Sequence, residues 1–252
     1  MLEGALIITG PTASGKSALA LALAQHVDIE IISADSAQVY RGMNIGTAKP
    51  SAGVLADVPH HLIDIRDPVE PYSAADFRQD LLTLVPDIHR RDRLPVIVGG
   101  TMLYLKALKN GLADLPAADQ AVREEISVQA VSHGWSSVHR ELQGIDPDAA
   151  QRIQPTDTQR LQRALEVYRL TGSTLTELHR RSTTPCPFPL TEIGILPDDR
   201  KKLHQVIEDR FLDMLDKGFV EEVAALKSKP ENHKGLPALR AVGYRQIWSY
   251  LE

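Results

Sequence analysis

Gly10-Pro11-Thr12-Ala13-Ser14-Gly15-Lys16-Ser17 is the stretch of this 252-residue chain that decides its fold. It matches G-x-x-x-x-G-K-[ST], a pattern whose glycines let several backbone N–H groups point at one phosphate chain. An apolar run at residues 5–9 precedes it and strong helix formers at 17–24 follow it, so the loop joins a buried strand to a helix. The context predicts a phosphate-binding loop in which Lys16 supplies charge and Ser17 offers a hydroxyl to Mg²⁺.

More apolar runs follow along the chain. Residues 29–33, 62–65 and 94–98 are each typical of a buried strand, and residues 74–91 have a helical pattern between two of them. Apolar strands that alternate with helices indicate a parallel sheet with helices on both faces. The first part of the chain is therefore predicted to be an α/β core.

The middle of the chain has a different pattern. Between residues 116 and 181 we find helical spacing and no convincing strand. In one helix of this region, predicted at 158–170, Asp157 can form the N-cap and Gly172 can end the helix. The region is therefore predicted to be an all-helical insertion domain.

The strand pattern returns after the insertion. Residues 192–196 are typical of a strand, and residues 200–217 of a long amphipathic helix. The simplest architecture is an α/β sheet that is interrupted and then resumed. We predict a core at 1–112, the helical insertion at 113–190 and a second core segment at 191–252.

The composition excludes several protein classes. With 43% hydrophobic and 24% charged residues the chain is globular, and a net charge of −5 excludes a globally basic nucleic-acid-binding module. Acidic residues are in excess over residues 1–150, whereas basic residues slightly exceed them over 151–252. The single cysteine, Cys186, cannot form an internal disulfide. No apolar run approaches the roughly 18 residues of a membrane span, and no secretory signal is visible, so we expect a cytoplasmic protein.

Two polar side chains follow predicted strands. Asp35 comes just after the strand at 29–33, and Thr101 follows the strand at 94–98. Since ligands of doubly wound sheets bind at the carboxyl ends of the strands, both side chains should face the phosphate loop, with Asp35 as a general base. Each has an alternative role as the N-cap of a following helix, which for Thr101 would be the helix at 102–108.

Two classes of enzyme remain open on these residues alone. One is a small-molecule kinase in which Asp35 activates a hydroxyl acceptor. The other transfers a different group away from a diphosphate held in the same loop. A motor or GTPase is disfavoured, because the strand at 94–98 ends without an acidic residue and no Asn-Lys-x-Asp signature is present.

Further motifs occur in order along essentially the whole chain. They are SADSAQVY at 33–40, GMNIGTAKP at 42–50, YSAADF at 72–77, VGGTMLY at 98–104, DTQRLQRALEVY at 157–168 and RAVGYR at 240–245. Together with the phosphate loop, this set resembles the tRNA dimethylallyltransferases, also called tRNA isopentenyltransferases. The resemblance implies a P-loop kinase-like core and a helical insertion that clasps the anticodon stem-loop of tRNA.

The same resemblance implies a reaction. A dimethylallyl group would pass from dimethylallyl diphosphate to N6 of the adenosine at tRNA position 37, giving N6-dimethylallyladenosine and diphosphate, with Mg²⁺ as cofactor. Asp35 would be the general base, Thr101 would lie near the leaving oxygen, and residues 10–17 would hold the diphosphate, with Ser17 on the metal. A P-loop small-molecule kinase and a non-catalytic RNA-binding regulator are the alternatives.

The resemblance also implies which positions contact tRNA. Arg160 and Arg163 are three residues apart and share one helix face, which on local evidence alone is an ordinary solvated face. The family usually continues for several tens of residues into a basic helical segment, so we expect a C-terminal tail to be missing, and we expect a monomer without membrane contact. The implied tRNA-contacting residues are Asp35, Ser36, Ala37, Gln38, Thr101, Arg123, Gln159, Arg160, Leu161, Gln162, Arg163, Arg240, Ala241, Val242, Gly243, Tyr244 and Arg245.

Overall fold

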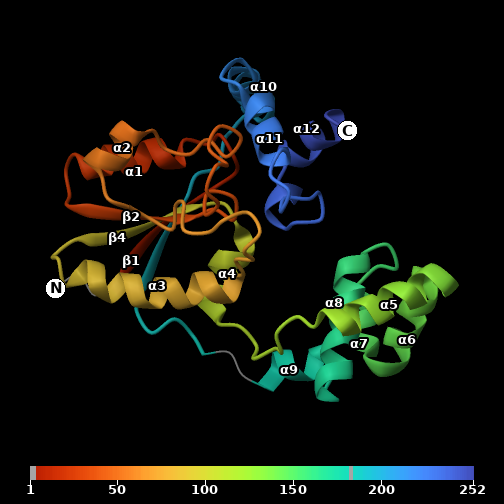
Figure 1. Ribbon diagram of the computed structural model, residues 1–252. Helices are drawn as coiled ribbons and strands as arrows, with labels where there is room; N and C mark the ends of the chain where they lie inside the picture. Colours follow the sequence, from red (N-terminus) through yellow and green to blue (C-terminus); the bar gives the residue numbers. More distant parts are fainter. Residues whose placement is uncertain (1–3, 182–183) are drawn as a thin grey trace. The chain divides into compact units, whose positions relative to one another are not determined.

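A computed structural model describes residues 4–181 and 184–252 of the chain. Its internal contacts divide the chain into two compact units (Figure 1). One unit consists of Met1–Lys109 and Cys186–Glu252 and is built on a β-sheet, and the other, Asn110–Pro185, is made of helices.

The α/β unit is organised by one sheet of five parallel strands in the spatial order β3-β2-β4-β1-β5. The central strands are rich in apolar and β-branched residues and are buried on both faces, as a parallel sheet requires. The predicted α/β fold with a parallel sheet is confirmed. The strands are β1 (Ala5–Thr9), β2 (Ile29–Ala34), β3 (His60–His61), β4 (Leu94–Gly99) and β5 (Leu190–Gly194).

Helices cover both faces of this sheet because neighbouring strand residues point to opposite sides. Ile7, Ile32 and Ile97 pack into a core with residues of α3 and α4. Ile8 and Ile31 face the other side, which α1 covers (Figure 1). The helices of the unit are α1 (Lys16–Ala24), α2 (Ala52–Asp57), α3 (Ala74–His89), α4 (Met102–Asn110), α10 (Arg200–Asp216), α11 (Phe219–Lys227) and α12 (Tyr244–Tyr250), with a short 3₁₀ helix η1 (Ala238–Arg240).

The helical unit has a core of its own, which includes Ile126, Val138 and Leu165. Asp157 accepts the backbone N–H of Arg160 at the start of its fourth helix, and Gly172 ends that helix in the left-handed conformation at φ +68°, as predicted. The helices are α5 (Gln120–His133), α6 (Trp135–Ile145), α7 (Pro147–Arg152), α8 (Thr158–Thr171) and α9 (Leu175–Arg181).

Three sequence predictions differ from the structure in their bounds, and one of them is the strand predicted at 192–196, which lies at Leu190–Gly194. The strand predicted at 62–65 lies at His60–His61 instead, because Leu62 and Asp64 have φ angles of +62° and +54°, which break extended pairing. The insertion predicted at 113–190 covers Asn110–Pro185. Its end lies earlier because residues 186–189 already belong to the core, where the N–H of Ala5 donates to Pro189 O.

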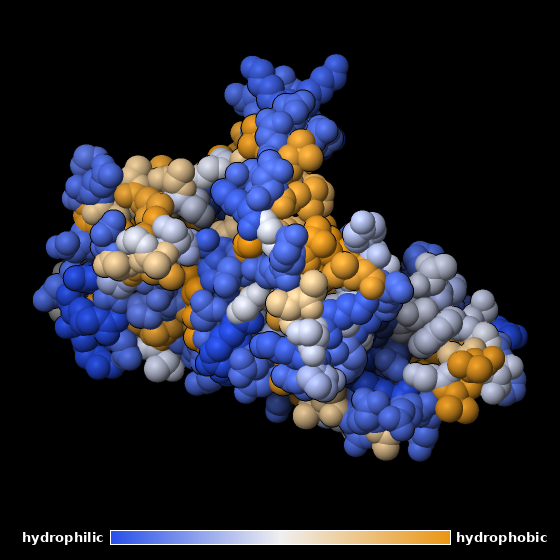
Figure 2. All heavy atoms as spheres, turned by 45° about the horizontal axis from the view of Figure 1, so that its top comes forward, coloured by the Kyte–Doolittle hydropathy of each residue, from blue (hydrophilic) through white to orange (hydrophobic). Residues whose placement is uncertain are grey.

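The surface in Figure 2 is a mosaic in which hydrophilic residues cover much of the visible face and hydrophobic ones gather in smaller areas. Within residues 4–181 and 184–252, none of the helices is both long and apolar enough to cross a bilayer.

Candidate active site

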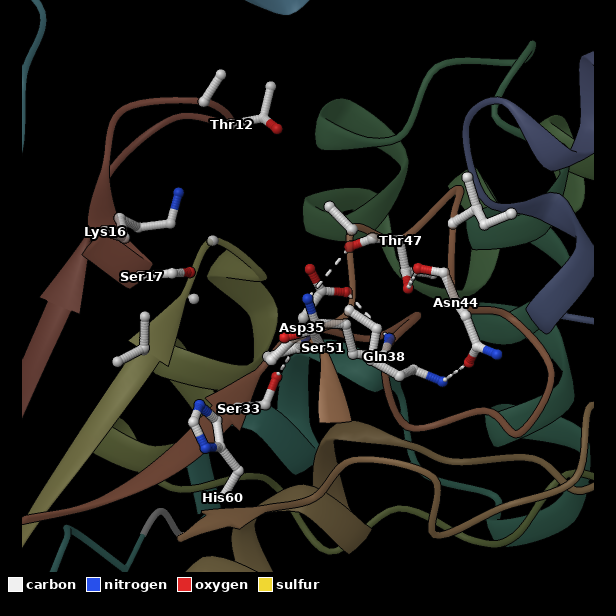
Figure 3. A pocket seen from close by; sticks show the side chains of 18 of the residues that line it. Thr12, Lys16, Ser17, Ser33, Asp35, Gln38, Asn44, Thr47, Ser51 and His60 are labelled. Carbon is white, nitrogen blue, oxygen red and sulfur yellow. Dashed lines mark hydrogen bonds between the residues drawn. The ribbon is translucent and has the colours of Figure 1, made fainter. Parts of the chain in front are cut away.

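A cavity of about 1130 Å³ lies at the carboxyl ends of the parallel strands of the α/β unit. Its walls come from the loops that follow β1, β2 and β4, from the segment between β2 and α2, and from the second half of α10. Lys16 and Ser17 face it from one side, and Asp35, Gln38 and Thr47 from the other (Figure 3). The predicted crevice is therefore present, and it joins the phosphate loop to Asp35 and Thr101.

The phosphate loop joins β1 to α1. Gly10 packs so tightly that an added Cβ would lie 2.5 Å from the backbone oxygen of Ile195, and Gly15 starts α1 in the left-handed region at φ +88°. The Lys16 ammonium donates to the carbonyls of Gly10 at 2.9 Å and Pro11 at 2.6 Å. Gly10, Pro11, Thr12, Ala13, Lys16 and Ser17 line the cavity, whereas Ser14 and Gly15 do not.

Lys16, Asp35 and Arg210, three of the charged side chains that line this cavity, interact electrostatically. Burial lowers the pKa of the Lys16 ammonium; the Asp35 carboxylate opposes this change and the Arg210 guanidinium adds to it. Arg210 comes from α10, and sequence reasoning missed it. An arginine inside an amphipathic helix gives no local signal of which loop the helix will face.

Asp35 lies directly after β2. Its Oδ1 accepts the backbone N–H of Ala37 at 2.8 Å and of Gln38 at 3.4 Å. Residues 36–39 form a turn and not a helix, so the alternative role of Asp35 as a helix N-cap is excluded. Within the described residues we find no hydrogen bond to Oδ2, which leaves that oxygen for a ligand in the cavity.

Thr101 lies directly after β4 and Gly100. Its Oγ1 accepts the N–H of Ser36 at 3.1 Å, and its own N–H donates to Ala34 O at 3.2 Å. The side chain thus connects the ends of β2 and β4 at the cavity wall. The carbonyl oxygen of Thr101 accepts the N–H groups of Tyr104 and Leu105 at the start of α4, while its hydroxyl bonds to Ser36, and its role in the site stays a prediction.

Gln38 has a fixed amide group. Its Oε1 accepts a hydrogen bond from the buried Ser33 hydroxyl at 2.9 Å, and its Nε2 donates to Thr47 O at 3.2 Å (Figure 3). Ser33 and Thr47 line the cavity, but sequence reasoning assigned neither of them a role. Apart from the family resemblance, the sequence around these two residues contains no motif that predicts a role for them.

A less polar wall completes the cavity. Ile31, Leu55 and Val98 line it beside His60, whose Nδ1 lies 2.7 Å from Val58 O. Burial lowers the pKa of His60, so the imidazole is mainly neutral near pH 7.

The oxygen donors at the cavity fit Mg²⁺. The Ser17 hydroxyl, the predicted metal ligand, is a hard oxygen donor of the kind this ion prefers. The described residues contain no cluster of three or more histidine, cysteine or acidic side chains that could hold a metal alone. Such a sparse donor set suits an ion that takes most of its ligands from a bound diphosphate and water.

The predicted RNA positions at 240–245 differ in exposure. Arg240, Val242 and Arg245 are exposed, whereas the Tyr244 ring is only 1% exposed and its hydroxyl donates to Glu222 at 2.5 Å. A direct RNA contact by the Tyr244 side chain is incompatible with this burial. Gly243 is also buried, and Ala241 is half-buried.

The predicted RNA positions of the helical unit lie on α5 and α8. Gln159 and Arg160 are exposed, Gln162 and Arg163 are half-buried, and Leu161 lies in the core. Leu161 therefore supports the helix and does not face a ligand.

Glu166 of α8 organises two of these predicted contacts. Its carboxylate is fully buried and accepts from Arg123 Nε at 2.8 Å and Arg163 NH1 at 2.7 Å. Burial raises the pKa of Glu166, but hydrogen bonds from both arginines and from the Asp119 N–H outweigh it, and the net pKa is lowered. Arg123 and Arg163 are thus held as an ordered basic pair.

Sequence comparison places the chain among known proteins. The family model described as IPP transferase matches residues 38–252. The tRNA dimethylallyltransferase of Alkalilimnicola ehrlichii is 53% identical over 247 residues, which is 98% of this chain and 78% of that protein.

Solved structures are similar along nearly the whole chain. The tRNA isopentenylpyrophosphate transferase of Bacillus halodurans is 40% identical with a TM-score of 0.67, over 99% of this chain and 77% of that one. A eukaryotic dimethylallyltransferase acting on tRNA is 28% identical with a TM-score of 0.82, over 99% of this chain and 63% of that one.

Proposed function

Because this chain belongs to the IPP transferase family, whose members are tRNA prenyltransferases, we propose that it transfers a dimethylallyl group from dimethylallyl diphosphate to N6 of the adenosine at tRNA position 37. The observation that carries this proposal is the cavity, which joins a phosphate loop to a carboxylate and a fixed amide. A leaving diphosphate and an acceptor base can occupy such a site together.

The phosphate loop would hold the diphosphate. Lys16 would exchange its hydrogen bonds to two loop carbonyls for phosphate oxygens, and Arg210 would approach from α10. Mg²⁺ on the Ser17 hydroxyl would supply further neutralisation of the diphosphate charge. All these charges favour the bond cleavage, because negative charge builds on the diphosphate as the allylic C–O bond breaks.

Asp35 would take the proton. The adenine N6 amine is a weak nucleophile, since its lone pair is delocalised into the ring. As N6 bonds to the allylic carbon, the C–O electron pair leaves with the diphosphate and an N6 proton passes to the carboxylate. The N–H groups of Ala37 and Gln38 bind Oδ1 and orient the carboxylate, and Oδ2 would accept the N6 proton.

The remaining cavity walls suit the five-carbon group of the diphosphate substrate and the adenine base of the tRNA. Ile31, Leu55 and Val98 offer apolar surface for the five-carbon group, and the mainly neutral His60 adds no full charge there. Thr101 and Gln38 offer hydrogen bonds to the diphosphate and the base. An adenosine must leave its stack to reach them, so the reaction requires base flipping.

Exposed basic residues would bind the tRNA backbone. Arg160, Arg240 and Arg245 are exposed, and the ordered pair of Arg123 and Arg163 adds charge on the helical unit. We propose the anticodon stem-loop as the bound part and the monomer as the active form, in the cytoplasm.

A transfer assay tests the proposal. The protein is incubated with labelled dimethylallyl diphosphate, Mg²⁺ and unmodified tRNA with adenosine at positions 36 and 37, beside a tRNA with guanosine at 37. Label is expected only in the first tRNA. A folded protein that labels neither tRNA contradicts the proposal, and phosphate transfer from ATP to a metabolite hydroxyl would support a kinase instead.

A further inference from the structure

Glu222 of α11 binds the backbone of the loop after Tyr40. Its Oε2 accepts the N–H groups of Asn44 at 2.9 Å and Ile45 at 2.8 Å, and its Oε1 lies 3.2 Å from the N–H of Gly46. One carboxylate therefore satisfies three consecutive backbone donors of a segment some 180 positions away in the sequence.

Two aromatic rings complete this clamp. The buried Tyr244 of α12 donates its hydroxyl to Glu222, and the rings of Phe219 and Tyr244 pack edge to face with centroids 4.9 Å apart. Both rings lie against Gly46 so closely that no Cβ would fit there. Burial, and then the Glu222 carboxylate, raise the pKa of Tyr244 well above its ordinary value, so the phenol remains a donor.

The other side of the clamped loop is the cavity wall. Asn44, Ile45 and Thr47 line the cavity, and Thr47 O accepts the hydrogen bond that orients the Gln38 amide. Glu222 does not line the cavity. Its carboxylate can therefore act on the site only through the loop.

We propose that Glu222 is a positioning residue for the acceptor side of the reaction. It fixes residues 44–46, the adjoining Thr47 carbonyl holds Gln38, and the Gln38 amide keeps one N–H and one oxygen lone pair for the edge of an adenine, which offers a matching acceptor and donor. The inference rests on the proposed function. The diphosphate side, built from Lys16 and Ser17, has no bond to this clamp.

The test compares three variants with the wild type. Glu222→Gln keeps the shape but loses one acceptor oxygen, Tyr244→Phe removes only the hydroxyl bond, and Glu221→Gln changes an exposed neighbour on the same helix. We expect Glu222→Gln to lower kcat/KM for tRNA on the order of 10- to 100-fold, as misplacement of a substrate-positioning group does. The KM for dimethylallyl diphosphate should be unchanged, with a smaller effect for Tyr244→Phe and none for Glu221→Gln.

Backbone amide exchange gives a readout that is independent of activity. Protection at residues 44–46 should fall in Glu222→Gln and remain in Glu221→Gln. The positioning role is overturned if kcat/KM for tRNA is unchanged. It is also overturned if the KM for dimethylallyl diphosphate rises as much as the KM for tRNA. If Glu222→Gln does not fold, Tyr244→Phe carries the same comparison. A wild type without transfer activity refutes the proposed function instead, and the exchange data still decide whether the clamp exists.

Discussion

At the scale of single residues, Asp35 has two tasks on one carboxylate. Oδ1 holds the turn through the N–H groups of Ala37 and Gln38, and Oδ2 is left for the substrate. Asp35→Asn keeps an acceptor for the turn but cannot take a proton. We expect turnover to fall by about 10²- to 10⁴-fold, with tRNA binding little changed.

Single-turnover rates and a gel-shift titration measure these two effects. Asp35→Ala also removes the turn acceptor, so it should add a loss of tRNA affinity that Asp35→Asn does not show. Turnover of Asp35→Asn at the wild-type level would refute the base assignment.

Lys16 predicts a pH effect on diphosphate binding. Burial lowers its pKa from the ordinary 10.5, so the ammonium loses its proton at a lower alkaline pH than an exposed lysine. The charge is present below that pKa and lost above it, and the KM for dimethylallyl diphosphate should rise as pH increases through it. Lys16→Arg keeps its charge throughout and should give a flatter KM profile. Identical profiles would contradict the assignment.

The sequence predicts part of the site and misses part of it for a physical reason. Residues 10–17, Asp35 and Thr101 could be predicted because they follow strands, and strand ends meet at one edge of a parallel sheet. Arg210 and Glu222 could not, because each lies inside a helix whose facing partner depends on long-range packing.

At the scale of elements, two of the arginines of α8 differ in their surroundings. Arg160 is exposed and pairs with Asp157 at 3.4 Å, whereas Arg163 is held by the buried Glu166. Arg160→Glu should weaken tRNA binding at no cost in folding. Arg163→Glu should also lower the melting temperature of the protein, because it puts a second acid beside a buried carboxylate.

Filter binding and thermal unfolding separate these two outcomes. Arg152→Glu, at the end of α7 and outside the predicted RNA positions, is a charge-matched control for affinity. Equal melting temperatures for Arg160→Glu and Arg163→Glu would show that the ion pair between Arg163 and the buried Glu166 does not stabilise the fold.

Glu30 of β2 should make the stability of the fold depend on pH in the acid range. The hydrogen bond from Arg91 lowers its pKa to about 2, aided by His61 and against the effect of burial. Because the folded pKa is lower than the unfolded one, the stabilisation is complete above about 4.5 and is lost as pH falls toward 2. Unfolding midpoints in denaturant should fall less steeply with acid in Glu30→Gln than in the wild type or in the exposed Asp57→Asn.

The elements differ in how far the sequence predicts them. The long apolar strands β1, β2 and β4 were placed correctly because their burial leaves a clear pattern. The strand at 62–65 was wrong because apolar residues also occur in irregular backbone, here at the left-handed Leu62. The short helix α2 has no buried residue and hence no apolar stripe to detect.

At the scale of the whole molecule, each unit has its own core. The residues that line the candidate cavity belong to the α/β unit. Dimethylallyl diphosphate with Mg²⁺ should therefore raise the melting temperature of the α/β unit, since a ligand stabilises the part that binds it.

Calorimetry with and without the ligand measures this effect, with Lys16→Ala as the control that should lose it. Fluorescent labels placed in each unit would assign the transitions. An upward shift of the helical unit alone would contradict the placement of the diphosphate.

The position of β5 has a consequence for the order of events during synthesis. Ala5 of β1 is aligned with Leu190 of β5, so the edge of β1 stays without its neighbour until the ribosome has released the whole helical unit. Helical contacts within 110–185 are close in sequence and form quickly, whereas the β1–β5 pairing must wait for a very long loop to close. The pairing of β5 with β1 is thus a late step of assembly, and until then a nascent chain carries an open strand edge that other chains can join.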